Sequence, residues 1–140
     1  MIPNAFKKNV FNADVDFIND TIKVELLTSS HSSNEDSQEF IADVSANEVS
    51  GTNYSAGGAT LTGKSVSQDD TDNEGVFTAN DVTWADADGF TARYAAVYKD
   101  TGNPATSPII TIIDLGEDKP AGGGDFVLNW DAEGIVNATN

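Results

Sequence analysis

The stretch TARYAAVYKDTGNPATSPIITIIDLG, residues 91–116, decides the fold. Its first part belongs to FTARYAAVYK at 90–99, where side chains alternate across a strand. The residues expected on one face are Phe90, Ala92, Tyr94, Ala96 and Tyr98. The segment IITIIDL at 109–115 is apolar on both faces, which is typical of a central strand covered on both sides. Between them, a glycine and two prolines indicate a turn, so the stretch predicts a strand pair.

The rest of the chain repeats this pattern of short strands and turns. In TIKVELLT at 21–28, apolar side chains alternate with Lys23 and Glu25, which predicts a half-buried strand. Turn signals recur about every eight to twelve residues, with about eight short strands between them. We therefore predict an all-β fold, a single β-sandwich-like domain over residues 21–140. The predicted core includes Tyr94, Ile110, Ile112, Phe126 and Leu128.

Residues 1–20 precede this strand pattern and are predicted to be an N-terminal arm or a short helix. Within PNAFKKNVFN at 3–12, the apolar residues Phe6, Val10 and Phe11 offer much hydrophobic surface for a loose terminus. Terminal segments of this kind often become ordered on a partner. We therefore predict that these three side chains bind a partner, and that deletion of residues 1–12 leaves a folded domain.

The charge balance limits the possible partners. The chain has 7 Lys and Arg against 23 Asp and Glu, a formal net charge of −16. Such a surface repels nucleic-acid phosphates and anionic membranes, so neither is an expected partner. The longest apolar run, IITII, is far shorter than the roughly 20 residues that span a bilayer. The excess of acidic residues favours a surface whose role is to keep the protein soluble. The alternative is that these residues contact a basic partner or bind cations.

The motif DTDNEG at 70–75 is the clearest candidate for chemistry. Asp70, Asp72 and Glu74 occupy positions 1, 3 and 5 of a loop, and Asp81 occupies position 12. This spacing follows the calcium-binding loop of EF-hands, so the four carboxylates are candidate Ca²⁺ ligands. Position 5 of that template is normally Asp or Asn, and no helices are expected to flank the loop. These departures favour a solvated acidic turn over a metal site.

No other pattern predicts catalysis or a cofactor. The chain has no cysteine, which excludes disulfides and thiolate metal sites. His31, the only histidine, lies in a serine-rich loop without a partner in sequence. Among 23 acids the sequence selects no carboxylate pair for glycoside hydrolysis. The aromatic side chains Trp84, Trp130, Tyr94 and Tyr98 suit a sugar-stacking platform, but their positions favour core filling. We therefore expect a protein that is not an enzyme.

Four segments resemble a family of small structural proteins of tailed bacteriophages, which includes capsid cement or decoration proteins. They are DVSANEVSGTNYSAGGATLTGKSV, DVTW, TARYAAVYKDTGNPATSPIITIIDLGEDK and GDFVLNWDAEGIV. The similarity runs from about residue 20 to residue 136. The resemblance implies a β-sandwich-like domain, no catalysis and assembly in many copies. It supplies no catalytic or cofactor-binding residues.

The expected function is therefore that of a capsid decoration protein on the exterior of a virion. It would be made in the host cytoplasm, bind the major capsid protein and stabilise joints between capsomers. A homotrimer or another homo-oligomer is expected, because closed symmetric rings are the usual oligomers. Two alternatives stay open: a tail-tip or fibre module that binds a host-surface glycan, and a calcium-dependent adhesion domain.

Overall fold

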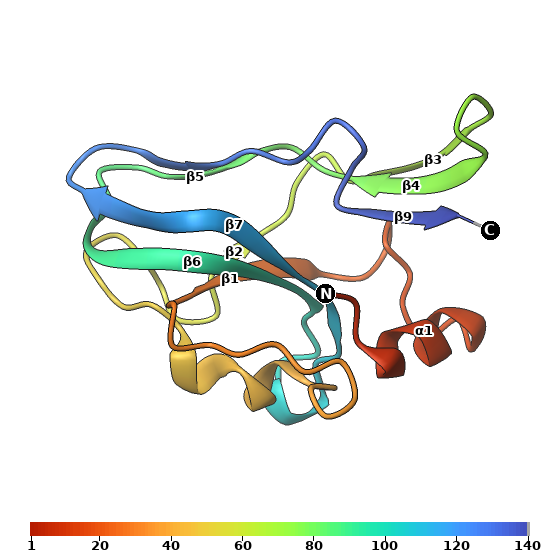
Figure 1. Ribbon diagram of the computed structural model, residues 1–140, viewed down its shortest axis with the longest axis horizontal. Helices are drawn as coiled ribbons and strands as arrows, with labels where there is room; N and C mark the ends of the chain where they lie inside the picture. Colours follow the sequence, from red (N-terminus) through yellow and green to blue (C-terminus); the bar gives the residue numbers. More distant parts are fainter. Residues whose placement is uncertain (140) are drawn as a thin grey trace.

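A four-stranded antiparallel sheet lies at the centre of the computed structural model, which describes residues 1–139 (Figure 1). Its strand order is β2-β1-β6-β7. The strands are β1 (Ile22–Leu27), β2 (Ala59–Thr60), β6 (Asp88–Lys99) and β7 (Ile109–Gly122). The long strands β6 and β7 pair antiparallel on either side of the proline-containing loop, which confirms the predicted strand pair.

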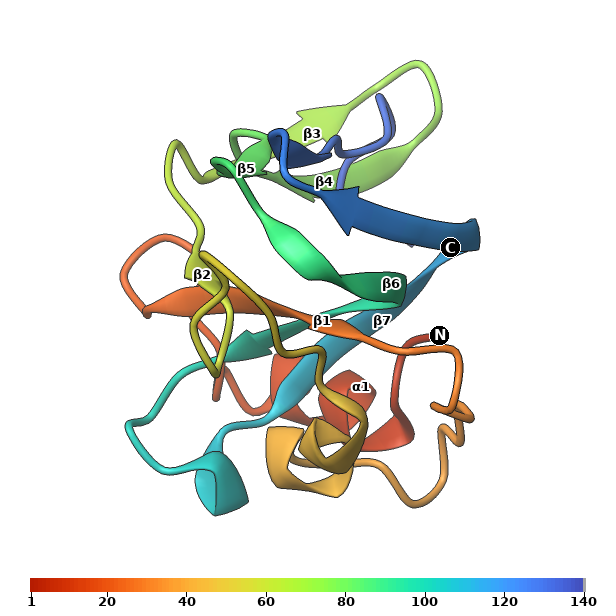
Figure 2. The ribbon, with the colours of Figure 1, turned by 90° about the vertical axis from the view of Figure 1, so that its left-hand side faces the viewer.

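Two layers cover this sheet, one on each face (Figure 2). One layer holds the sheet β3-β4-β9 and the pair β5-β8. Their bounds are β3 (Ser65–Asp69), β4 (Glu74–Thr78), β5 (Val82–Trp84), β8 (Phe126–Leu128) and β9 (Val136–Thr139). The other layer holds the 3-10 helices η1 (Ile41–Asp43), η2 (Ser45–Asn47) and η3 (Pro104–Thr106). The predicted all-β fold with a short N-terminal helix is confirmed, with nine strands in antiparallel sheets among residues 1–139.

The N-terminal helix α1 (Asn4–Phe11) begins after Pro3, whose fixed φ suits a helix start. It ends where Ala13 adopts a positive φ of 58° and the Asp14 N–H donates to the carbonyl of Asn9. This is a helix-terminating turn of the left-handed kind. The helix therefore has defined ends at both termini.

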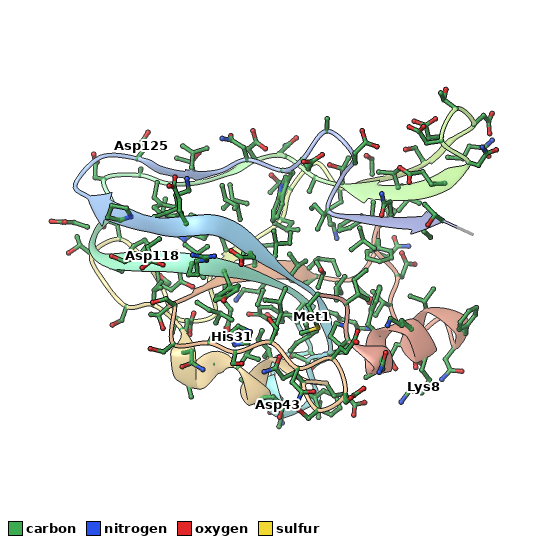
Figure 3. The ribbon with its side chains drawn as sticks, in the orientation of Figure 1. Met1, Lys8, His31, Asp43, Asp118 and Asp125 are labelled. Atoms are coloured by element: carbon green, nitrogen blue, oxygen red, sulfur yellow. The ribbon has the colours of Figure 1, made fainter. Side chains whose placement is uncertain are left out.

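The segment before and after α1 is part of the folded domain. The ammonium of Met1 donates to the carbonyl of Ile112 at 2.6 Å, and the Ile112 N–H donates back to the Met1 carbonyl, so Met1 lies beside β7 (Figure 3). Phe6 is 4% exposed and meets Phe17 edge to face, and Phe17 stacks on Phe77 of β4. The prediction that Phe6 binds a partner is therefore wrong, because its ring fills the core. Val10 and Phe11 are exposed and stay candidates.

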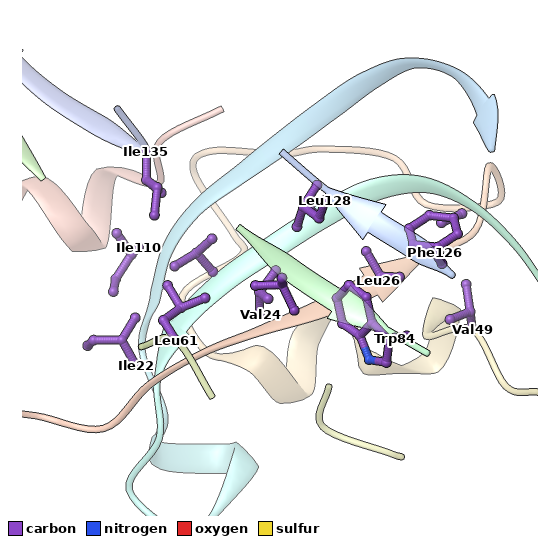
Figure 4. Packing of buried hydrophobic residues seen from close by; sticks show 14 of the residues in the cluster. Ile22, Val24, Leu26, Val49, Leu61, Trp84, Ile110, Phe126, Leu128 and Ile135 are labelled. Carbon is purple, nitrogen blue, oxygen red and sulfur yellow. The ribbon is translucent and has the colours of Figure 1, made fainter. Parts of the chain in front are cut away.

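The hydrophobic core has two clusters, one on each face of the central sheet. The larger lies between the sheet and the strand layer and includes Ile22, Val24, Leu26, Trp84, Ile110, Phe126 and Leu128 (Figure 4). The smaller lies under the 3-10 helices and includes Leu27, Ile41, Val44, Ala96, Tyr98, Ile109 and Ile112. Of the predicted core residues, four are buried and Tyr94 is half-buried against the smaller cluster.

Two predicted strand faces need correction. Strand β1 is covered on both sides, because the helix layer buries Glu25 to 1% exposure. In β6, a register shift between Ala92 and Tyr94 interrupts the alternation. Phe90 and Ala92 consequently point into the larger cluster, while Ala96 and Tyr98 point into the smaller one. We predicted that Phe90 and Ala92 share a face with Tyr94, Ala96 and Tyr98. That prediction is therefore wrong for Phe90 and Ala92.

Candidate functional site

The predicted calcium ligands are not brought together. Asp70 and Asp72 lie in the turn between β3 and β4, where the Asp69 carboxylate accepts the backbone N–H of Asp72 at 3.2 Å. Asp81 instead accepts the Trp130 N–H at 3.0 Å, and Glu74 is buried in β4. Across residues 1–139, no group of three or more histidine, aspartate or glutamate side chains is placed to hold a metal ion. The turn has the hydrogen bonds of a solvated acidic loop.

Calcium should accordingly act on this protein only through general screening. We expect added CaCl₂ to raise the melting temperature of the wild type and of Asp72→Asn by the same amount, because Asp72 is one exposed carboxylate among many. Thermal denaturation with and without CaCl₂ measures both shifts, and NaCl of equal ionic strength should reproduce them. A clearly smaller shift in Asp72→Asn would instead indicate that the loop rearranges around a bound ion.

A polar pocket of about 380 Å³ lies on the helix side of the central sheet. Strand β1 contributes Lys23 and Glu25, because alternation points both side chains away from the larger cluster. The remaining polar side chains come from Ser45, Glu48, Tyr98, Asp100 and Ser107. The pocket thus combines residues from β1, β6 and the 3-10 helices η1, η2 and η3 with residues of the adjoining loops.

Glu25 is the most deeply buried acid of the pocket. Its carboxyl oxygens lie 3.1 and 3.3 Å from the Ser45 hydroxyl oxygen, which is also 2.8 Å from the carbonyl of Ile41. Burial, and next the charge of Glu48, raise the pKa of Glu25 to about 8, whereas Ser45 and Lys23 act in the opposite direction. Glu25 is therefore mostly protonated at neutral pH and able to donate a hydrogen bond to Ser45.

Glu48 is held in place by two donors. Its Oε1 accepts the Tyr54 hydroxyl at 2.9 Å and the Gly57 N–H at 2.7 Å. The Tyr54 oxygen accepts the Leu26 N–H, and the Tyr98 hydroxyl donates to the Gly57 carbonyl at 2.7 Å. These bonds fasten the loop that carries Glu48 onto β1 and β6.

Gly58 permits this close approach of the loop to β1. Its φ is +71°, and an added Cβ would clash with the carbonyl of Val24.

Burial raises the pKa of both neighbouring phenols, Tyr54 and Tyr98, above the usual value for tyrosine. The two phenols therefore act as neutral hydrogen-bond donors at physiological pH.

Lys23 provides the positive charge of the pocket. Its ammonium lies 3.8 Å from a carboxylate oxygen of Asp100, and both side chains are less than a third exposed. Among the lining residues, three carboxyl groups (Glu25, Glu48 and Asp100) therefore face this one ammonium. The arrangement is chemically suited to hydrogen bonding and to binding positive charge.

The other polar and aromatic candidates lie in the protein interior or pack against it. His31 is buried, with Nε2 at 3.1 Å from the Ser33 hydroxyl, and burial lowers its pKa (Figure 3). Trp84 and Tyr98 are buried, which confirms core filling for them, and Trp130 packs against the larger cluster. Among the described residues, no helix has the length and apolar character needed to cross a bilayer.

Sequence analysis missed Glu25 and Glu48 as site residues. Lys23 and Glu25 alternate with apolar residues, which is the ordinary pattern of a solvent-facing strand side. The available signal was the Gly57-Gly58 pair, because adjacent glycines permit the close backbone approach that brings Glu48 to β1. That signal indicates a close approach without saying which strand is approached.

No protein-family model, no curated protein and no solved structure matches the chain.

Proposed function

We propose that this protein is a non-enzymatic capsid decoration protein of a tailed bacteriophage, which binds the assembled major capsid shell. The observation that carries this proposal is the apolar end of α1. Phe11 is 91% exposed and its neighbour Val10 is 46% exposed. An exposed phenylalanine at the tip of a helix is the kind of side chain that anchors protein interfaces. The resemblance to small virion proteins supports the same assignment.

The helix presents these side chains rigidly. Its inner face is buried through Phe6 and Asn9. On its outer side, Lys7 and Lys8 lie 3.6 and 3.7 Å from the carboxylates of Glu35 and Glu39. A contact presented in this way loses less conformational entropy on binding than a flexible arm would lose. We therefore replace the predicted arm with a preformed contact.

Stabilisation of the capsid would follow from mass action. A protein that binds only the assembled shell lowers the free energy of that state. Binding through α1 leaves much of the acidic surface toward solvent, where it keeps particles apart. We propose a homotrimer, or another closed homo-oligomer, at joints between capsomers. The net charge of −16 opposes self-association at low salt, so added salt or the shell itself should favour the oligomer.

Replacing Phe11 with alanine tests the contact. We expect Phe11→Ala to fold normally but to bind particles that lack the protein at least tenfold more weakly, because hot-spot residues contribute about 2 kcal/mol or more. Co-sedimentation with such particles measures the binding. Val127→Ala in β8 is the control, because that valine is another exposed apolar side chain, 46% exposed, and belongs to a different element. Wild-type binding by Phe11→Ala would contradict the role of α1.

A further inference from the structure

We propose that the pocket beneath η1, η2 and η3 binds a primary ammonium group, which Glu25 and Glu48 contact directly. The ammonium belongs either to a lysine side chain or to a free alkylamine. This inference goes beyond the capsid role and does not depend on it. It rests on the hydrogen bonds of Glu25, the charges that line the pocket, and the pocket's size.

Glu25 has fewer donors than a buried carboxylate needs. It is 1% exposed and lines the pocket, and its polar neighbour is the Ser45 hydroxyl. That hydroxyl has one hydrogen, and the closer acceptor is the carbonyl of Ile41 at 2.8 Å. When Ser45 donates there, the ionised carboxylate of Glu25 loses the hydrogen bond that this hydroxyl otherwise gives it. An ammonium carries three donors and a compensating charge, so it supplies what this carboxylate lacks.

The charges around Glu25 also favour a cation. The polar groups that face the pocket with it are Lys23 of β1, Tyr98 of β6, Ser45 of η2, Glu48 before β2, Asp100 after β6 and Ser107 after η3. Helices η1 and η3 contribute the uncharged residues Ile41 and Pro104. Lys23 is directed toward Asp100, at 3.8 Å, which leaves Glu25 and Glu48 for an incoming cation.

The pocket has the size and walls for a short alkylamine. Its volume of about 380 Å³ lies at the small end of the range for ligand sites. Ile41, Ala56 and Pro104 offer apolar surface. A lysine-like chain of four methylenes packs its stem on such surface while its charged end reaches polar groups.

Binding of the cation should expel the proton from Glu25. In the empty pocket at neutral pH the carboxyl is protonated, and the ammonium replaces that proton, which is released to water. The affinity should therefore rise with pH until Glu25 is ionised in the free protein. From pH 6 to pH 9 the expected gain is roughly fiftyfold to hundredfold, because the ionised fraction rises by about that factor. An alkylammonium keeps its charge over most of this range.

Titration with n-butylammonium chloride, followed by NMR of the methyl signals of Ile41 and Ala56, tests the proposal. We expect saturable shifts at pH 9, much weaker binding at pH 6, and no shifts with the uncharged analogue 1-butanol. Glu25→Gln should bind at least tenfold more weakly at pH 9 and lose the pH dependence. This variant is close in shape to the protonated acid, so it should fold.

Lys23→Gln is the opposite control, because it removes the competing ammonium and should tighten binding. Spermidine and an acetylated, amidated lysine then test whether the natural ligand is a free amine or a lysine side chain of a protein. Tighter binding of spermidine indicates a free amine, and tighter binding of the lysine derivative indicates a protein side chain. The proposal is overturned if butylammonium fails to bind at pH 9, if Glu25→Gln binds like the wild type, or if butanol binds equally well.

Discussion

Replacing Phe6 with alanine is expected to lower the free energy of unfolding by about 3–5 kcal/mol. The ring is 4% exposed and packs edge to face on Phe17 at 6.1 Å between centroids. Truncation removes buried apolar surface and leaves a cavity beside the ring of Phe17, which in turn stacks on Phe77. Urea denaturation of the wild type and the variant measures the difference.

Phe11→Ala is the matched control for this prediction, because the same substitution removes a ring that is 91% exposed. Its free energy of unfolding should stay within about 0.5 kcal/mol of the wild type. Deletion of residues 1–12 should unfold or strongly destabilise the domain, since it removes both Phe6 and the Met1–Ile112 pairing. A deletion variant with wild-type stability would mean that the segment is an arm after all.

Replacing Glu25 with glutamine should stabilise the protein at alkaline pH. Burial raises the pKa of Glu25 from 4.5 in the unfolded chain to about 8 in the folded one. The folded chain therefore holds an extra proton between these values, and the free energy of unfolding falls as pH rises from 4.5 to 8. Glutamine does not titrate, so the free energy of unfolding of Glu25→Gln does not fall for this reason as the pH rises. The variant should gain up to about 5 kcal/mol over the wild type at pH 9 and little at pH 4.

The surrounding acids require a control for this prediction, because repulsion among them also grows with pH. Glu133→Gln removes the same charge from an exposed position. Its stability should follow the wild type within about 0.5 kcal/mol at both pH values. Chemical denaturation at pH 4, 6 and 9 compares the three proteins. Parallel curves for Glu25→Gln and the wild type would contradict the burial of an acid in β1.

Alternation and turn residues were sufficient to predict the strands of this fold. The apolar runs around Ile110 and Phe126 identify two buried strands, because each side chain there has one preferred environment. The bulge between Ala92 and Tyr94 was not predictable, since it depends on how β7 continues past Asp114. Nor was the place of Phe6, which is fixed by a contact with a ring eleven residues away.

The candidate pocket was less accessible from sequence than the fold. Glu25 looks solvent-facing because the helices that cover it are one turn long and leave no periodic signal. Its neighbours Ser45 and Glu48 come from the segment around η2 and Tyr98 comes from β6, and local sequence patterns do not show which distant segments meet. The acidic loop at Asp70 is the opposite case. Its carboxylates have the sequence spacing of a calcium-binding loop, but the structure does not bring them together.

The copy number and the position of this protein on purified virions decide whether it has the proposed role on the capsid. Quantitative mass spectrometry against the major capsid protein, together with a density map of the particle, measures both. We expect a copy number of the same order as that of the capsid subunits, with density over joints between capsomers. A few copies confined to the tail, or the absence of the protein from the particle, would contradict it.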